Sequence, residues 1–179
     1  NMPSIQQEVL YAMDPSAAPA AGSEAPPTRF GAKDVQDLGQ KNLLDAFSCT
    51  ECGRCSAACP AQHTGKLLSP RRIMMRTRDR MEDLAKLPID QRANDGKSLL
   101  HDYISVEELR ACTTCQACVQ ECPVSINPLD IIMQLRRYQI MEESQAPAEW
   151  TAMFGNVENN FAPWKFAPDD RDNWMQSSS

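Results

Sequence analysis

Apolar side chains recur at spacings of three and four residues in several stretches of the chain. In the first stretch, which follows Asp34, this spacing suits an amphipathic helix. Its apolar residues are Val35, Leu38, Leu43, Leu44 and Phe47. A second stretch opens with Ser69 as N-cap and Pro70 at the first helical position, and it has to end before Pro88. We predict a long helix there.

Two later helix starts carry capping signals. Ser105 with Glu108 three residues later predicts a capping box and a short helix through Leu109. Asn127 followed by Pro128 predicts a second capped start, and the apolar residues after it share one broad face. Strand signals are nearly absent. The predicted fold class is therefore mainly α.

The two ends of the chain have a different character. Residues 14–28 are rich in Pro and Ala and have almost no large apolar side chain, so we expect residues 1–33 to form a flexible or extended arm. Residues 34–145 form the expected helical domain. Residues 146–179 carry aromatic side chains with little periodicity, which favours an extended C-terminal strap. The strap either packs over its own domain or anchors another subunit, and we favour the second.

Composition and charge narrow the function classes. The chain has 179 residues, a net charge of -6 and a pI near 4.9, which argues against nucleic-acid binding. The sequence shows no membrane span and no signal peptide, so eight cysteines favour a reducing, cytoplasmic location. The first residue is Asn1, which leaves open a processed product or a piece of a longer polypeptide.

The cysteines form an internal repeat. Residues 49–60 read CTECGRCSAACP and residues 112–123 read CTTCQACVQECP, so both copies follow C-x2-C-x2-C-x3-C-P. The eight cysteines are Cys49, Cys52, Cys55, Cys59, Cys112, Cys115, Cys118 and Cys122. Gly53 allows the backbone of the first loop to approach a bound group closely.

This run is similar to the one by which bacterial ferredoxins hold a cubane cluster. In two-cluster ferredoxins the fourth cysteine of each run binds the other cluster. The resemblance therefore implies two [4Fe-4S] clusters. One would take Cys49, Cys52, Cys55 and Cys122, and the other would take Cys112, Cys115, Cys118 and Cys59.

Other uses of cysteine fit less well. A structural zinc site takes four ligands and gives no reason for a third cysteine and a following C-P in each copy. A disulfide framework disagrees with the expected compartment. A Rieske centre needs histidine ligands, and a three-iron cluster usually signals a missing ligand.

The long linker between the two runs changes the comparison. With it, FSCTECGRCSAACPA and LRACTTCQACVQECPVSINPLDIIMQLRR resemble the helical ferredoxin family, and within it the C subunit of heterodisulfide reductase, over about residues 40–142. The resemblance implies an α-helical ferredoxin with its clusters in loops between helices. It also implies a relay of single electrons within a multi-subunit oxidoreductase, without catalysis by this chain.

The implied partners are a CCG-domain iron-sulfur protein, a flavoprotein, or a membrane cytochrome or quinone-linked subunit. Through such a partner the chain would lie peripherally at the inner membrane. Two alternatives stay open. In the first, the chain is a fragment of a larger redox enzyme with cytochrome or CCG domains. In the second, its clusters serve a structural or redox-sensing role.

Some charged and polar residues remain to be assigned. Basic residues are concentrated between Lys66 and Lys86, which suits either a docking surface or a solvated helix face. Arg54, inside the first cysteine run, either raises a cluster potential or is an ordinary surface residue. His63 and His101 lie in no acid-base constellation, so neither receives a catalytic role.

Overall fold

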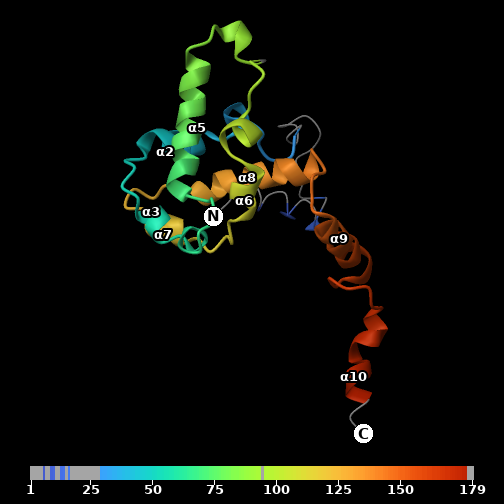
Figure 1. Ribbon diagram of the computed structural model, residues 1–179. Coiled ribbons are helices and arrows are strands. Elements are labelled where there is room, and N and C mark those ends of the chain that lie inside the picture. Colours follow the sequence, from blue (N-terminus) through green and yellow to red (C-terminus); the bar gives the residue numbers. More distant parts are fainter. Residues whose placement is uncertain are drawn as a thin grey trace. The chain divides into compact units, whose positions relative to one another are not determined.

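The computed structural model in Figure 1 describes residues 6, 9–10, 13–14, 16, 29–93 and 95–176. Its contacts divide the chain into two units, Asn1–Glu142 and Glu143–Ser179. The described residues contain no β-strand, and an isolated bridge joins Leu100 to Ile104. The prediction of a mainly α fold is confirmed.

Short helices and turns alternate with three longer helices. The elements of the first unit are η2 (Val35–Asp37), α2 (Gln40–Ser48), α3 (Arg54–Ala57), α4 (Pro60–His63), α5 (Pro70–Ala85), η3 (Ile89–Gln91), η4 (Leu99–Tyr103), α6 (Val106–Arg110), α7 (Ala117–Gln120) and α8 (Pro128–Met141). The second unit contains α9 (Ala148–Asn160), η5 (Pro168–Asp172) and α10 (Asn173–Gln176). Helix α5 packs against α2 and α8, and the small α3 packs against α7 (Figure 1).

The capping signals identify the starts of α5, α6 and α8 correctly. Helix α5 begins at Pro70 and ends before Pro88. Ser105 and Glu108 form the predicted capping box at α6, and the Asn127 side chain accepts a hydrogen bond from the Asp130 amide at α8.

Ser69 occupies the predicted N-cap position, but its side chain makes no capping bond. Its hydroxyl lies 2.8 Å from the Ser56 hydroxyl of α3 instead. This bond ties the start of α5 to the first cysteine run.

The helix predicted directly after Asp34 is wrong in its first turn. Residues 35–37 form a short 3-10 turn, because Asp34 and Asp37 close a capping box around it. The chain then runs extended through Leu38 and Gly39 before α2 begins. The predicted single helix is therefore two elements.

The buried face of α2 is also more polar than predicted. Leu44 and Phe47 are 65% and 55% exposed, whereas Asn42 and Asp45 are buried. The Asn42 amide donates to the Asp130 carboxylate at 2.8 Å, and the Asp45 carboxylate accepts from the Asn127 amide at 3.1 Å. The polar start of α8 therefore decides which face of α2 turns inward.

The apolar core of the first unit is contributed by helices far apart in the sequence. Its fully buried members come from α5, η4, α6 and α8 and from the connecting segments. They include Leu68, Ile73, Met74, Leu99, Leu100, Ile104, Leu109, Ile131, Ile132 and Leu135. This core joins α5 to α8, the two helices that follow the two cysteine runs.

Most of the predicted N-terminal arm lies outside the described residues. The part from Arg29 onward is bound to α8: the Phe30 amide donates to Glu142, and the Ala32 amide donates to the Gln134 carbonyl at 3.0 Å. Gly31, between them, has a φ of 74°. Ordered contacts therefore begin before Asp34.

The second unit contains a helix where an extended strap was predicted. Helix α9 follows Pro147 and spans thirteen residues. Trp150, Met153, Phe154 and Val157 lie at positions i, i+3, i+4 and i+7, which is helical spacing. Residues 148–160 are therefore not extended, because this spacing of their apolar side chains favours a helix.

Within the ranges given above, no helix is both long enough and apolar enough to span a membrane.

Candidate metal centre

The two cysteine runs fold in the same way. Glu51 and Thr114 are equivalent positions, and both have a φ of 57°. Gly53 and Gln116 are also equivalent, with φ values of 82° and 64°, and each precedes a short helix. Side chains other than glycine seldom adopt this left-handed conformation. The repeat is therefore one of backbone conformation as well as of sequence.

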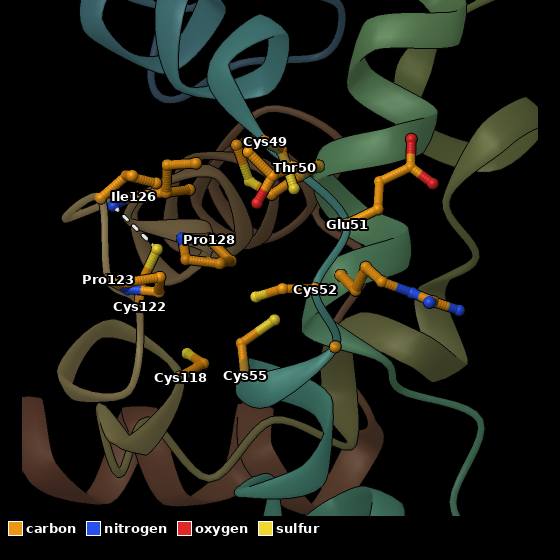
Figure 2. A pocket seen from close by; sticks show the side chains of 14 residues that line it. Cys49, Thr50, Glu51, Cys52, Cys55, Cys118, Cys122, Pro123, Ile126 and Pro128 are labelled. Atoms are coloured by element: carbon orange, nitrogen blue, oxygen red, sulfur yellow. Dashed lines mark hydrogen bonds between the residues drawn. The ribbon is translucent and has the colours of Figure 1, made fainter.

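Five cysteines line a pocket between the first run and the segment before α8. They are Cys49, Cys52, Cys55, Cys118 and Cys122. In Figure 2 the sulfurs of Cys52, Cys55 and Cys122 face a common space, and the Glu51 carboxylate points away from it. About 380 Å³ of the pocket is not filled by atoms, and this space includes its opening to solvent.

The second run lines a pocket of similar size. Cys112, Cys115 and Cys118 line it together with Cys59 from the first run, and about 330 Å³ of it, including its opening to solvent, is not filled by atoms. Its other side chains include Leu68, Leu129 and Ile132 of the core. Cys118 lines both pockets.

The loops offer backbone donors to the thiolates. The Thr114 amide lies 3.4 Å from the Cys112 sulfur, and the Ile126 amide lies 3.3 Å from the Cys122 sulfur (Figure 2 shows the second bond). Alternating left- and right-handed residues also create backbone nests that bind anionic groups, including iron-sulfur clusters. The donor set and the loops therefore fit a thiolate-ligated, negatively charged group.

Burial of the cysteines affects their protonation. Burial raises the pKa of Cys118 to about 12, with the neighbouring Cys112 adding to the effect. Burial also raises the pKa of Cys55 and of Cys112 above the usual range of a thiol. Thiols in such surroundings become thiolates when a metal replaces the proton, so metal binding and deprotonation are coupled.

The cysteines differ in their access to solvent. Cys52 and Cys115, the second cysteine of each run, are exposed, whereas Cys59 and Cys118 are buried. The four remaining cysteines are partly exposed. Each pocket therefore has one ligand position at the surface.

The cysteines do not form a compact single-ion site. Among the described residues, no group of three or more His, Cys, Asp or Glu side chains converges on one ion position. A cubane places different demands on its ligands, because each thiolate binds a different iron and the sulfurs stand apart around the cluster. The pocket linings match this wider arrangement.

An arginine on α8 fastens the second loop. The Arg136 guanidinium donates to the carbonyl oxygens of Leu109 and Cys112, with its Nε 3.0 Å from the Leu109 oxygen and its Nη2 2.5 Å from the Cys112 oxygen. Burial lowers the pKa of Arg136 below its usual value. The sequence pattern does not reveal this residue, because a contact from α8 back to the loop depends on tertiary packing.

The basic stretch between Lys66 and Lys86 is largely neutralised within the molecule. Arg76 pairs with Glu108 and Arg78 pairs with Glu51. Arg80 is buried between Asp34 and Asp95, and Lys86 pairs with Asp83. These ion pairs neutralise much of the positive charge that a docking surface would need.

The positions of Arg54 and Arg71 differ from those that the sequence suggests. Arg54, inside the first run, is exposed and does not line either cysteine pocket. Arg71, which belongs to the basic stretch between Lys66 and Lys86, lines the first pocket.

Comparisons with known proteins agree with this site. Residues 48–126 match the family described as the 4Fe-4S dicluster domain. FadF of Bacillus subtilis, named a probable iron-sulfur-binding oxidoreductase, is 31% identical over 83% of this chain and 26% of its own length. An EtfAB:quinone oxidoreductase of Syntrophomonas wolfei is 32% identical over 82% of this chain and 23% of its own length.

A shorter relative matches just over half of the chain. The C subunit of a CoB-CoM heterodisulfide reductase of Methanosarcina acetivorans is 36% identical over 58% of this chain and 52% of its own length. The chain thus spans about a quarter of the first two relatives and about half of this one. Its eight cysteines are the number that two [4Fe-4S] clusters require. Residues 48–126, which contain all eight cysteines, therefore have the sequence of a 4Fe-4S dicluster domain.

Proposed function

We propose that this chain relays single electrons through two [4Fe-4S] clusters within a larger oxidoreductase. The first cluster is bound by Cys49, Cys52, Cys55 and Cys122. The second is bound by Cys112, Cys115, Cys118 and Cys59. Each set lines one pocket, with the fourth cysteine of each run facing the three cysteines of the other, and this supports the crossed assignment.

The observation that carries the proposal is the position of Cys118, which lines both pockets. The helices that follow Gly53 and Gln116, α3 and α7, also pack against each other. Two groups held in these pockets are neighbours, and neighbouring redox groups suit a relay. When bound, each [4Fe-4S] cluster supplies a one-electron couple.

The residues around the two pockets bury part of each ligand set and leave one ligand of each set exposed. Met74 and Ile126 at the first pocket, and Leu129 and Ile132 at the second, are buried apolar side chains that keep water away. Exposed Cys52 and Cys115 bring one ligand of each set to the surface. An electron can therefore enter beside one run and leave beside the other.

The names of the relatives supply the partner classes. One relative is an EtfAB:quinone oxidoreductase, and another is the C subunit of a heterodisulfide reductase. We take a reduced flavoprotein as the donor class and a quinone-linked or CCG-domain subunit as the acceptor class. A two-electron donor gives its electrons singly to the chain, and a quinone acceptor finally takes two electrons and two protons.

Paired serine variants test the ligand sets. Cys122→Ser and Cys49→Ser should alter the same electron paramagnetic resonance (EPR) signal, and Cys59→Ser should alter the signal that Cys112→Ser alters. If Cys122→Ser instead perturbs the signal altered by Cys112→Ser, each run binds its own cluster and the crossed assignment fails.

Electron uptake tests the relay. The anaerobic protein should accept one electron per cluster from a reduced flavoprotein and return both electrons to a quinone analogue over repeated cycles. Clusters that neither accept nor return electrons would favour a structural role instead.

A further inference from the structure

One cation lies among the cysteines of the first pocket. Arg71, the second residue of α5, lines this pocket with Cys49, Cys52 and Cys55. Glu51 is the other charged residue in the lining, and Arg78 pairs with its carboxylate. The acid in the pocket lining is therefore paired with Arg78 and not with Arg71.

The Nε of Arg71 has no partner within the described part of the chain. The atom is buried, yet no hydrogen-bond acceptor of the protein reaches it. A buried donor without a partner is destabilising, and more so when the group is charged. Buried polar atoms of this kind call for an explanation, such as a bound group that the protein alone does not contain.

The position of Arg71 is fixed by the first cysteine run itself. The Ser56 hydroxyl lies 2.8 Å from that of Ser69 and accepts the Arg71 backbone amide at 3.3 Å. Ser56 follows Cys55 directly. The contact holds the first turn of α5 beside the thiolates and brings the Arg71 side chain to the pocket.

The second pocket differs in this respect. Its lining contains cysteines, apolar side chains, Thr113 and Gln116, and none of its lining residues is charged. The nearby Arg136 has its donors directed to the carbonyl oxygens of Leu109 and Cys112. A cationic donor without a hydrogen-bond partner therefore lies in the lining of the first pocket and not in that of the second.

We infer that Arg71 tunes the cluster of the first pocket, by donating its Nε hydrogen to a sulfur of that cluster and by placing a positive charge beside it. This inference rests on the proposed function. Hydrogen bonds to sulfur and nearby charge are two of the factors that set the potential of an iron-sulfur cluster. Both favour the more negative, reduced state, so Arg71 raises the potential of the first cluster.

Potentiometric EPR titration of the whole chain with its clusters tests this directly. Arg71→Gln should reduce the ratio of reduced to oxidised first cluster at a fixed potential about tenfold, equivalent to a one-electron shift of about 59 mV to lower potential. Arg71→Lys keeps the charge but replaces the guanidinium donor, so it should shift the potential less. Arg54→Gln, at an exposed position of the first cysteine run, is the matched control and should leave the potential unchanged.

A first-cluster potential unchanged in Arg71→Gln, with its full iron content, would overturn the inference. If Arg71→Gln loses the cluster, pulsed EPR on the unaltered protein containing nitrogen-15 arginine gives the answer. We expect a nitrogen coupling in the unaltered protein and its disappearance in Arg71→Lys. If the unaltered protein shows no such coupling, the inference is overturned. Clusters that are reduced but not reoxidised would contradict the relay alone, because the nitrogen coupling requires only the reduced state.

Discussion

The Nε of Arg80 on α5 donates to the Asp34 carboxylate at 2.9 Å, although 46 positions separate the two residues in sequence. The same guanidinium donates to Asp95 and to the carbonyl oxygen of Lys97. Arg80 is 1% exposed. One buried cation therefore joins the start of the domain, its longest helix and the loop before η4.

Removal of this cation should destabilise the domain strongly. Arg80→Met leaves two carboxylates without their partner, and breaking a buried ion pair in this way typically costs about 3–5 kcal/mol. Anaerobic urea unfolding followed by circular dichroism measures the change. Lys86→Met is the matched control, because the Lys86–Asp83 pair is exposed and should contribute little to the free energy of unfolding. Equal effects of the two variants would contradict the buried role of Arg80.

Acid should remove part of this stabilisation. Hydrogen bonding from Arg80 lowers the pKa of Asp95 from 3.8 to about 2. Because the folded state binds this proton more weakly than the unfolded state, the contribution is complete above about pH 4 and is lost as the pH falls towards 2. The difference in unfolding free energy between the parent protein and Asp95→Asn should therefore shrink over this range. A difference that does not change with pH would count against the pairing.

Gly31 is a sensitive point in the contact between the N-terminal segment and α8. A Cβ at this position would lie 2.3 Å from the Gln134 carbonyl oxygen and 2.6 Å from the Tyr138 amide nitrogen. Overpacking usually costs about 1–3 kcal/mol, in addition to about 1–2 kcal/mol for the left-handed backbone. Gly31→Ala should therefore lower the unfolding free energy by more than Gly96→Ala, which has a φ of 77° and open space around its Cβ. Similar losses in both variants would show that residue 31 does not approach α8 closely.

Arg136 should matter for the second cluster more than for the first. Arg136→Gln removes the guanidinium that donates to the loop carbonyl oxygens. A hydrogen bond from a charged donor contributes about 1.5–3 kcal/mol. We expect the variant to lose iron mainly from the second cluster, measured by iron analysis and EPR, whereas Arg54→Gln retains both clusters. Full occupancy and unchanged signals in Arg136→Gln would show that the loop does not depend on this arginine.

The parts of the fold that local signals control could be predicted from the sequence. The starts of α6 and α8 follow from Ser105 with Glu108 and from Asn127, because capping acts within one turn. The conformation of Gly53 could also be anticipated, since the first loop needs close backbone approach. Gln116 adopts the same conformation without being glycine, and its position in the repeat was the available signal.

Features that depend on tertiary contacts were not predictable in this way. The inward face of α2 is decided by Asn42 and its bond to Asp130, a residue 88 positions away. The role of Arg71 depends on the contact between Ser56 and Ser69, which joins two segments that the sequence does not show to be neighbours. A run of basic residues likewise does not reveal that Arg80 is buried and paired.

The crossed ligand sets require two [4Fe-4S] clusters side by side in this chain. Iron and sulfide analysis combined with low-temperature EPR of the anaerobically purified, fully reduced protein is the decisive test. The proposed ligand sets predict about eight irons and eight sulfides per chain, with EPR signals broadened by coupling between the two reduced clusters. Zinc in place of iron, one cluster per chain, or two clusters without magnetic interaction would contradict the claim.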